Sequence, residues 1–295
     1  MHLDVFIVLG SALIGLLVGM TGAGGGALMT PMLIFLFGVT PSAAISSDLV
    51  ASIFMRPVGA AVHLGRGTVN LGMVGWLALG SVPAALLGAF LLHVMGNGKA
   101  AETDVEVVLG AALLLGAAAM LVRAWWRRQP GAGLPDVTGE DVRIRRLATV
   151  AVGVVGGVLV GLTSVGAGSL MIVLLLFVYP ALGSSQLVGT DLVQAVPLTA
   201  AAALGQLLFG HVVLAVTASV VLGSVPAVLV GSLLSSRAPD RIVRPVITGV
   251  IVVSGLKYVG VGTAGLGVAA VLVGIGCAVW MLHGRRLARR PATLA

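Results

Sequence analysis

Eleven apolar stretches, most of them about as long as a membrane-spanning helix, constrain the fold of this chain more than any other feature. They run over residues 3–21, 23–38, 42–63, 70–94, 104–124, 147–163, 166–181, 184–209, 212–234, 244–262 and 264–283. Only 9% of the residues are charged, and the mean hydropathy of +1.14 lies far outside the range of soluble domains. The sequence therefore predicts an all-α polytopic membrane protein.

The two halves of the sequence repeat each other. A shift of 142 residues aligns Gly15 with Gly157, and a shift of 143 residues aligns the DLV motif at Asp48 with that at Asp191. Each copy holds five apolar segments, and because this number is odd, the second copy must enter the membrane in the opposite sense. We therefore predict two inverted repeats of five apolar helical segments, followed by one extra C-terminal helix.

The basic residues predict how these parts are oriented. We divide the chain into a first membrane repeat (1–124), a linker (125–146), a second, inverted membrane repeat (147–262), and an extra helix with a basic tail (263–295). Lys and Arg cluster in the linker and the tail, and such clusters mark the segments that stay in the cytoplasm. We expect a multi-pass cell-membrane protein whose basic excess sets its topology and contacts membrane lipid, with no nucleic acid partner.

Two glycine-rich stretches interrupt the apolar segments at corresponding positions of the repeats: GMTGAGGGALMTP at residues 19–31 and GLTSVGAGSLMIV at residues 161–173. The segments on either side of each interruption are either two full spans or a re-entrant hairpin. Interrupted helices at corresponding positions point to the central site of a transporter, because a broken helix offers its N-terminal amides to an anion. The alternative is that these glycines only let helices pack closely. The predicted substrate-binding residues are Thr21, Gly22, Gly24, Thr163, Ser164 and Gly166.

Charged residues inside the apolar segments add further candidates. Arg56 lies deep enough in its segment to supply positive charge to an anion, or it reaches back to the membrane interface. Asp48 and Asp191 are candidates for proton coupling, or they are helix-start acids that bind backbone amides. His63 is a third proton-coupling candidate, with a structural hydrogen bond as the alternative.

Other kinds of site are poorly supported by the sequence. The TGAGGG stretch follows no strand and precedes no GKS or GKT, so it is not interpreted as a nucleotide phosphate loop. Cys277 is the only cysteine, and we find no metal-ligand spacing and no catalytic triad. We therefore expect no enzymatic activity, no metal and no cofactor.

The glycine motif and its duplicate also resemble a known family. GLLVGMTGAGGGALMTPMLIFLFGVTPSAAISSDLVASIF (15–54) and GVLVGLTSVGAGSLMIVLLLFVYPALGSSQLVGTDLVQAV (157–196) are similar to the TauE/SafE family of membrane permeases. The resemblance implies transport of sulfur-containing anions such as sulfite and organosulfonates, mostly outward. The second copy departs from the first where Ser164, Ala167 and Val173 replace Gly22, Gly25 and Pro31.

Together, these features predict a gradient-coupled transporter that moves a small anion by alternating access. Its site is expected between the two glycine-rich motifs. Two alternatives stay open: a membrane subunit that docks a partner and transports nothing, and a passive anion channel. A homo-oligomer is compatible with all three interpretations.

Overall fold

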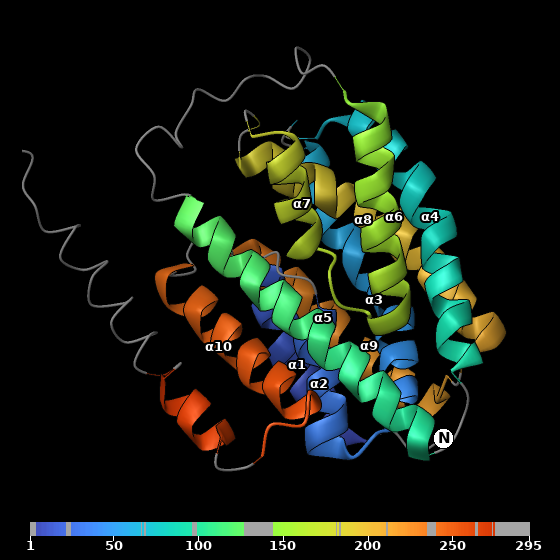
Figure 1. Ribbon diagram of the computed structural model, residues 1–295, viewed down its shortest axis with the longest axis vertical. Coiled ribbons are helices and arrows are strands. Elements are labelled where there is room, and N and C mark those ends of the chain that lie inside the picture. Colours follow the sequence, from blue (N-terminus) through green and yellow to red (C-terminus); the bar gives the residue numbers. More distant parts are fainter. Residues whose placement is uncertain are drawn as a thin grey trace, which may run out of the picture.

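The computed structural model is a bundle of helices (Figure 1). It describes residues 4–21, 25–65, 67, 69–95, 99–126, 144–180, 182, 184–210, 212–234, 240–262, 265–272 and 274. The labelled helices are α1 (Val5–Thr21), α2 (Gly26–Phe37), α3 (Pro41–Gly65), α4 (Leu71–Val94), α5 (Lys99–Trp126), α6 (Arg146–Thr163), α7 (Leu170–Val178), α8 (Ser184–Phe209), α9 (Leu214–Leu234) and α10 (Asp240–Tyr258). Residues 265–272 are also helical, and the described part of the chain contains no strand.

The helix ends lie close to the ends of the predicted apolar segments, because local signals stop and start each helix. Gly38 ends α2 in the left-handed conformation, with φ of 62°, and Pro41 opens α3 three residues later. The side chain of Asn70 caps α4 by accepting a hydrogen bond from the amide of Met73 at 2.9 Å. Within the described residues, six helices are long and apolar enough to cross a membrane: α3, α4, α5, α6, α8 and α9. The predicted all-α polytopic fold is thus confirmed.

Helices α2 and α7 are too short to cross the bilayer. They have 12 and 9 residues, which correspond to about 18 and about 14 Å of helix, against a hydrocarbon thickness of about 30 Å. Helix α2 runs back along α1, because Gly10 near the start of α1 lies against Met32 and Phe37 of α2. The α1–α2 pair therefore forms a hairpin within the molecule. Of the two alternatives left open by the sequence, the short second helices favour re-entrant hairpins.

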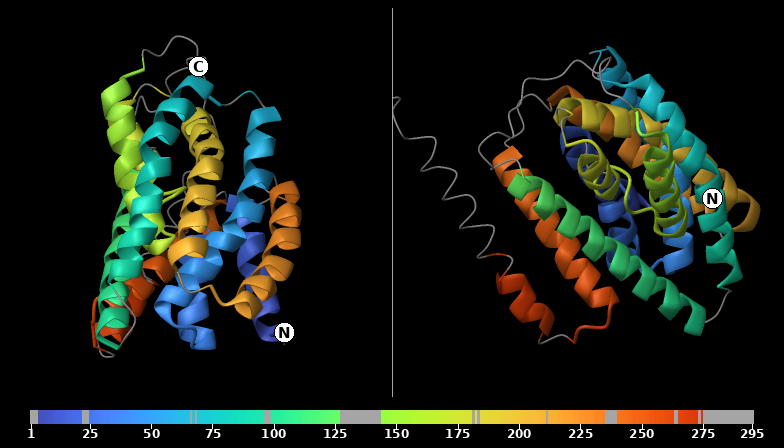
Figure 2. Two further views of the ribbon diagram at one scale, coloured as in Figure 1. Left: turned by 90° about the vertical axis from the view of Figure 1, so that its right-hand side faces the viewer. Right: turned by 45° about the horizontal axis from the view of Figure 1, so that its top comes forward.

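Glycine-lined contacts join helices from different halves. Helix α1 packs along α9, and α4 packs along α6, as the two views in Figure 2 show. A Cβ atom added to Gly15 would lie 2.6 Å from the carbonyl oxygen of Ser224, and one added to Gly157 would lie 2.5 Å from that of Ser81. These two contacts correspond under the sequence repeat. Glycine is needed at these positions because the helices pack too closely for a side chain. This packing joins the two halves of the molecule.

Equivalent helices of the two halves run in opposite directions where they meet. Ser46 near the start of α3 binds Gln206 near the end of α8, so α3 and α8 are antiparallel. Helices α5 and α10 lie side by side and are likewise antiparallel, because Gly110 of α5 lies against Tyr258 at the end of α10 (Figure 1). Such opposite directions are expected of an inverted duplication.

We predict that Gly157→Ala destabilises the protein, although alanine normally stabilises a helix interior relative to glycine. The new methyl group would push α6 away from the backbone of α4, at a cost of about 1–3 kcal/mol. Thermal unfolding in detergent measures this change. Gly75→Ala on α4 is the matched control, because no atom lies within 4 Å of its added Cβ. Equal melting temperatures for the two variants would contradict the assigned packing.

Candidate functional site

The break between α6 and α7 is a defined turn. Ser164 ends α6 in the left-handed conformation, with φ of 60°, and its amide binds the carbonyl of Val160 at 2.8 Å. Gly166 and Gly168 follow with φ of 123° and 95°. Side chains other than glycine rarely adopt such angles, so the glycines of this motif allow the chain to turn sharply in the interior. Ser164 is held there against its own conformational preference.

Several polar groups of this break form hydrogen bonds within the break and with the end of α6. The hydroxyl of Thr163 donates to the carbonyl of Leu159 at 2.6 Å and accepts from the amide of Val165 at 3.2 Å. The carbonyl of Gly166 accepts from the amides of Ser169 and Leu170 at 3.4 and 3.1 Å. In this conformation, the hydroxyl of Thr163, the amide of Ser164 and the carbonyl of Gly166 therefore serve local structure.

The second break lies against the start of α2. A Cβ atom on Gly26 would collide with the carbonyl oxygen of Ser164, so the two backbones touch. Val165 packs in one apolar cluster with Ala27 and Leu28. The start of α2 is where the first glycine-rich stretch ends, so the two motifs meet in the interior. Of the predicted residues in the first motif, Gly22, Gly24 and the side chain of Thr21 lie outside the described residues.

Asp48 lies where these elements meet and is fully buried. Its Oδ2 atom accepts hydrogen bonds from the hydroxyls of Thr30 at 3.2 Å and Ser164 at 2.6 Å. Asp48 is the eighth residue of α3, which begins at Pro41, and its carboxylate accepts from hydroxyls of other segments. Its Oδ1 atom has no hydrogen-bond partner among the described residues.

Arg56 shares the face of α3 that carries Asp48. Asp48, Ser52 and Arg56 are spaced by four residues, and helical side chains lean towards the N-terminus, so the guanidinium is directed back along this stripe. Arg56 is only 7% exposed, and it is attracted by the carboxylates of both Asp48 and Asp191. The residue predicted to supply positive charge is therefore buried within electrostatic reach of the two predicted proton-coupling acids. It does not extend to an interface.

Buried hydroxyls complete this polar cluster. Ser47 and Ser52 on α3 are at most 1% exposed, and neither hydroxyl has a hydrogen-bond partner among the described residues. On α8, one turn after Asp191, buried Gln194 binds Ser81 of α4 through Nε2 at 2.6 Å. Unpartnered buried polar atoms are uncommon in folded proteins, and they mark a place where a polar ligand gains hydrogen bonds.

The sequence interpretation missed Ser52, Gln194, Gln206 and Thr30. The four-residue spacing of Ser52 from Asp48, and the three-residue spacing of Gln194 from Asp191, were signals that could have found two of them. Gln206 binds Ser46 of α3 at 2.8 Å and the carbonyl of Gly161 at 3.1 Å, so it ties α8 to both α3 and α6. No sequence signal identified these partners.

His63 is not brought to this cluster. It lies in the last turn of α3, 15 residues beyond Asp48, which corresponds to about 22 Å along the helix axis. Its side chain is half-buried there. Asp48 and Asp191 lie within electrostatic reach of Arg56, whereas His63 lies outside this cluster, near the end of α3.

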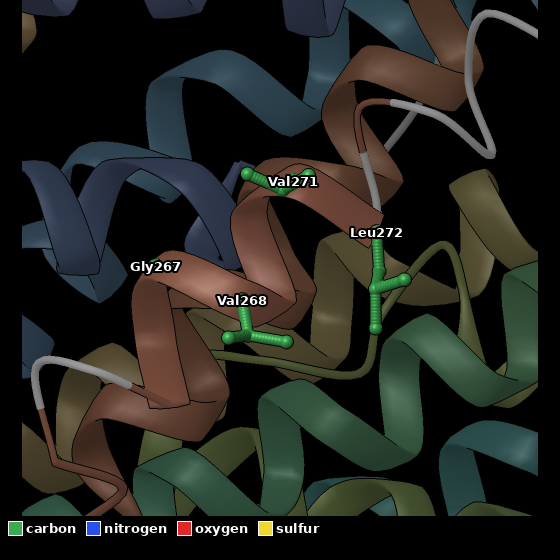
Figure 3. A pocket seen from close by; sticks show the side chains of 4 residues that line it. All are labelled: Gly267, Val268, Val271 and Leu272. Atoms are coloured by element: carbon green, nitrogen blue, oxygen red, sulfur yellow. The ribbon is translucent and has the colours of Figure 1, made fainter.

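Neither a metal site nor a second polar site emerges from the described residues. No three His, Cys, Asp or Glu side chains within them are grouped so as to hold a metal ion. A surface hollow on helical residues 265–272 is lined by Gly267, Val268, Val271 and Leu272 (Figure 3). All four residues are apolar, so the hollow offers no side-chain group for an anion.

Comparison with known proteins identifies the family. The family model described as "Sulfite exporter TauE/SafE" matches residues 7–258, which is most of the chain. The chain belongs to the TauE/SafE family. The resemblance predicted from the glycine motifs is thereby confirmed, and the match covers both motifs, Asp48, Arg56 and Asp191.

Relatives in the TauE/SafE family are named as transporters. "Probable membrane transporter protein YjnA" of Bacillus subtilis (strain 168) is 37% identical over 258 residues, which cover 87% of this chain and all of the relative. "Probable membrane transporter protein YdhB" of the same strain is 24% identical over 85% of this chain and 98% of the relative. No solved structure matches the fold significantly. This TauE/SafE member is therefore a multi-pass membrane transporter.

Proposed function

We propose that the protein moves a small anion, sulfite or an organosulfonate, across the cell membrane by gradient-coupled alternating access. The observation that carries the proposal is buried Arg56, one helical turn after Ser52, whose buried hydroxyl lacks a partner among the described residues. A buried arginine in a membrane protein is costly and therefore marks a functional site by default. Its planar guanidinium offers paired donors that match two oxygens of a sulfonate or sulfite group.

The substrate site lies on α3, between the start of α2 and the break after α6. Arg56 supplies charge, and the hydroxyl of Ser52 supplies a neutral donor. Gly166 shapes the opposite wall, and Thr163 and Ser164 hold the turn. Thr21, Gly22 and Gly24 of the first motif remain predicted contributors. The family description, sulfite exporter, supports the substrate class, and neither relative's name specifies an anion.

The short helices α2 and α7, which follow the two breaks, support alternating access. Short helices α2 and α7 each begin at a glycine-rich break in the interior. Helix α2 contacts the full-length helix α3, and α7 contacts the full-length helix α8. Rotation of these short helices relative to the interlocked α1–α9 and α4–α6 pairs would expose Arg56 first to one side and then to the other. The linker and C-terminus are assigned to the cytoplasm on their basic residues.

Counterflow in proteoliposomes tests the proposal. Purified protein, reconstituted with unlabelled sulfite or methanesulfonate inside, should take up the labelled anion transiently against its gradient, and uptake should saturate. Such exchange requires one site that alternates between the two sides. A channel gives flux without counterflow, and a docking subunit gives no flux, so either result with correctly inserted protein would overturn the proposal.

A further inference from the structure

Asp48 connects the two halves of the molecule. It belongs to α3 of the first half, and its Oδ2 atom binds Ser164, which ends α6 of the second half, at 2.6 Å. It also binds Thr30 on α2 at 3.2 Å. A hydrogen bond to a charged carboxylate is roughly twice as strong as one to a neutral group. The contact between α3 and the second break therefore depends on whether Asp48 is ionised.

The charges of the polar cluster do not balance. Two carboxylates, Asp48 and Asp191, surround one guanidinium, that of Arg56, so the cluster carries one net negative charge when all three are ionised. An added monoanion would raise this to two negative charges in a dehydrated interior. Uncompensated buried charge is strongly unfavourable, and proteins usually respond by taking up a proton.

Among the side chains that the structure describes, the other elements packed against α3 supply no positive charge. Helices α2 and α9, and the break at 164–169, contain no ionisable side chain, and α8 contributes Asp191 alone. The described acidic side chains of α5 are Glu102, Asp104 and Glu106 near its start, and Glu102 binds the hydroxyl of Ser42 at 2.7 Å. The side chains of its cations, Lys99 and Arg123, lie outside the described ones. On α3 itself, His63 lies about 22 Å from Asp48 along the axis.

We propose, on the basis of the function given above, that Asp48 binds one proton with each transported monoanion, and that this proton weakens its bond to Ser164. The proton binds to Oδ1, which has no partner among the described residues, while the anion binds Arg56. With the Ser164 bond weakened, the loaded protein shifts towards the state open to the other side. After anion and proton leave, ionised Asp48 binds Ser164 again and favours the state described here.

The first test measures coupling in proteoliposomes with methanesulfonate, whose charge does not change near neutral pH. With the membrane potential held at zero, each unit of pH gradient should accumulate the anion about tenfold, because one proton accompanies one charge. A membrane potential alone should drive no accumulation. Accumulation that follows a sodium gradient or the membrane potential, with no response to pH, would overturn the proposal.

The second test separates carriage of the proton from the Ser164 bond. Asp48→Asn should retain counterflow but lose pH-driven accumulation, whereas Ser164→Ala should retain both but slow net uptake severalfold, because only the return of the empty protein uses the bond. Glu102→Gln is the matched control, since it alters another carboxylate that binds a serine hydroxyl, and it should behave as wild type.

Each result bears on the proposal. Tenfold accumulation by Asp48→Asn would overturn proton carriage by this residue. If Asp48→Asn also loses counterflow, the Ser164→Ala variant decides whether the proposal holds. Slower net uptake with normal counterflow in that variant supports the proposal. Equal slowing of net uptake and counterflow contradicts it. Absence of counterflow in the wild-type protein would instead refute the proposed function.

Discussion

Arg56→Gln is expected to reduce anion counterflow by at least about 100-fold while the protein still inserts into the membrane. Removing one partner of a buried charged cluster costs about 3–5 kcal/mol, and each 1.4 kcal/mol corresponds to a tenfold change in binding. The loss arises because Asp48 and Asp191 remain buried without the guanidinium that attracts both. Labelled anion counterflow in proteoliposomes, normalised to inserted protein, measures the effect.

Arg56→Lys serves as the graded control for this prediction. Lysine keeps the positive charge but loses the planar pair of donors, so we expect partial counterflow, with an apparent anion affinity well below that of wild type. If glutamine and lysine variants transport as well as the wild-type protein, Arg56 does not bind the anion. The site would then have to be sought elsewhere in the molecule.

Gly26→Ala is expected to have the second large effect, because it forces apart the two glycine-rich motifs. The added methyl group would collide with the carbonyl oxygen of Ser164, and backbone atoms cannot move aside as a flexible side chain can. Overpacking of this kind costs about 1–3 kcal/mol. We expect a lower melting temperature in detergent and a loss of counterflow of about tenfold or more.

The adjacent glycine provides a matched control. Gly25→Ala places its methyl group 3.5 Å from the flexible end of Met55, which is an ordinary van der Waals contact. This variant should therefore melt and transport like the wild-type protein. If both alanine variants behave alike, the contact between the start of α2 and the second break is unimportant for transport.

Much of the fold could be predicted from the sequence because membrane helices are local in origin. An apolar run of about 20 residues predicts its own span, and the turns at Gly38 and Pro41 predict where α2 ends and α3 begins. The repeat then related the helices of one half to those of the other. Whether α2 and α7 crossed the membrane could not be decided, since their lengths depend on how far each glycine motif extends as a turn.

The site was only partly predictable, because it depends on contacts between residues far apart in the chain. Repeat position and charge identified Asp48, Asp191 and Arg56 as candidates. The bond from Ser164 to Asp48 joins residues 116 positions apart, and no sequence pattern signals such a pairing. The same holds for Gln206, which looks like an isolated polar residue in the sequence but binds α3 and α6. His63 lies on the same helix as Asp48, but the distance along that helix keeps it out of the cluster.

The pairing of α1 with α9 and of α4 with α6 has a consequence for how the protein is made. When the ribosome has synthesised only the first half, α1 and α4 lack the glycine-lined neighbours that they contact in the finished molecule. Arg56 is likewise without Asp191 at that moment. The first half can therefore reach its final packing only after the second half has been inserted and its helices have packed against those of the first.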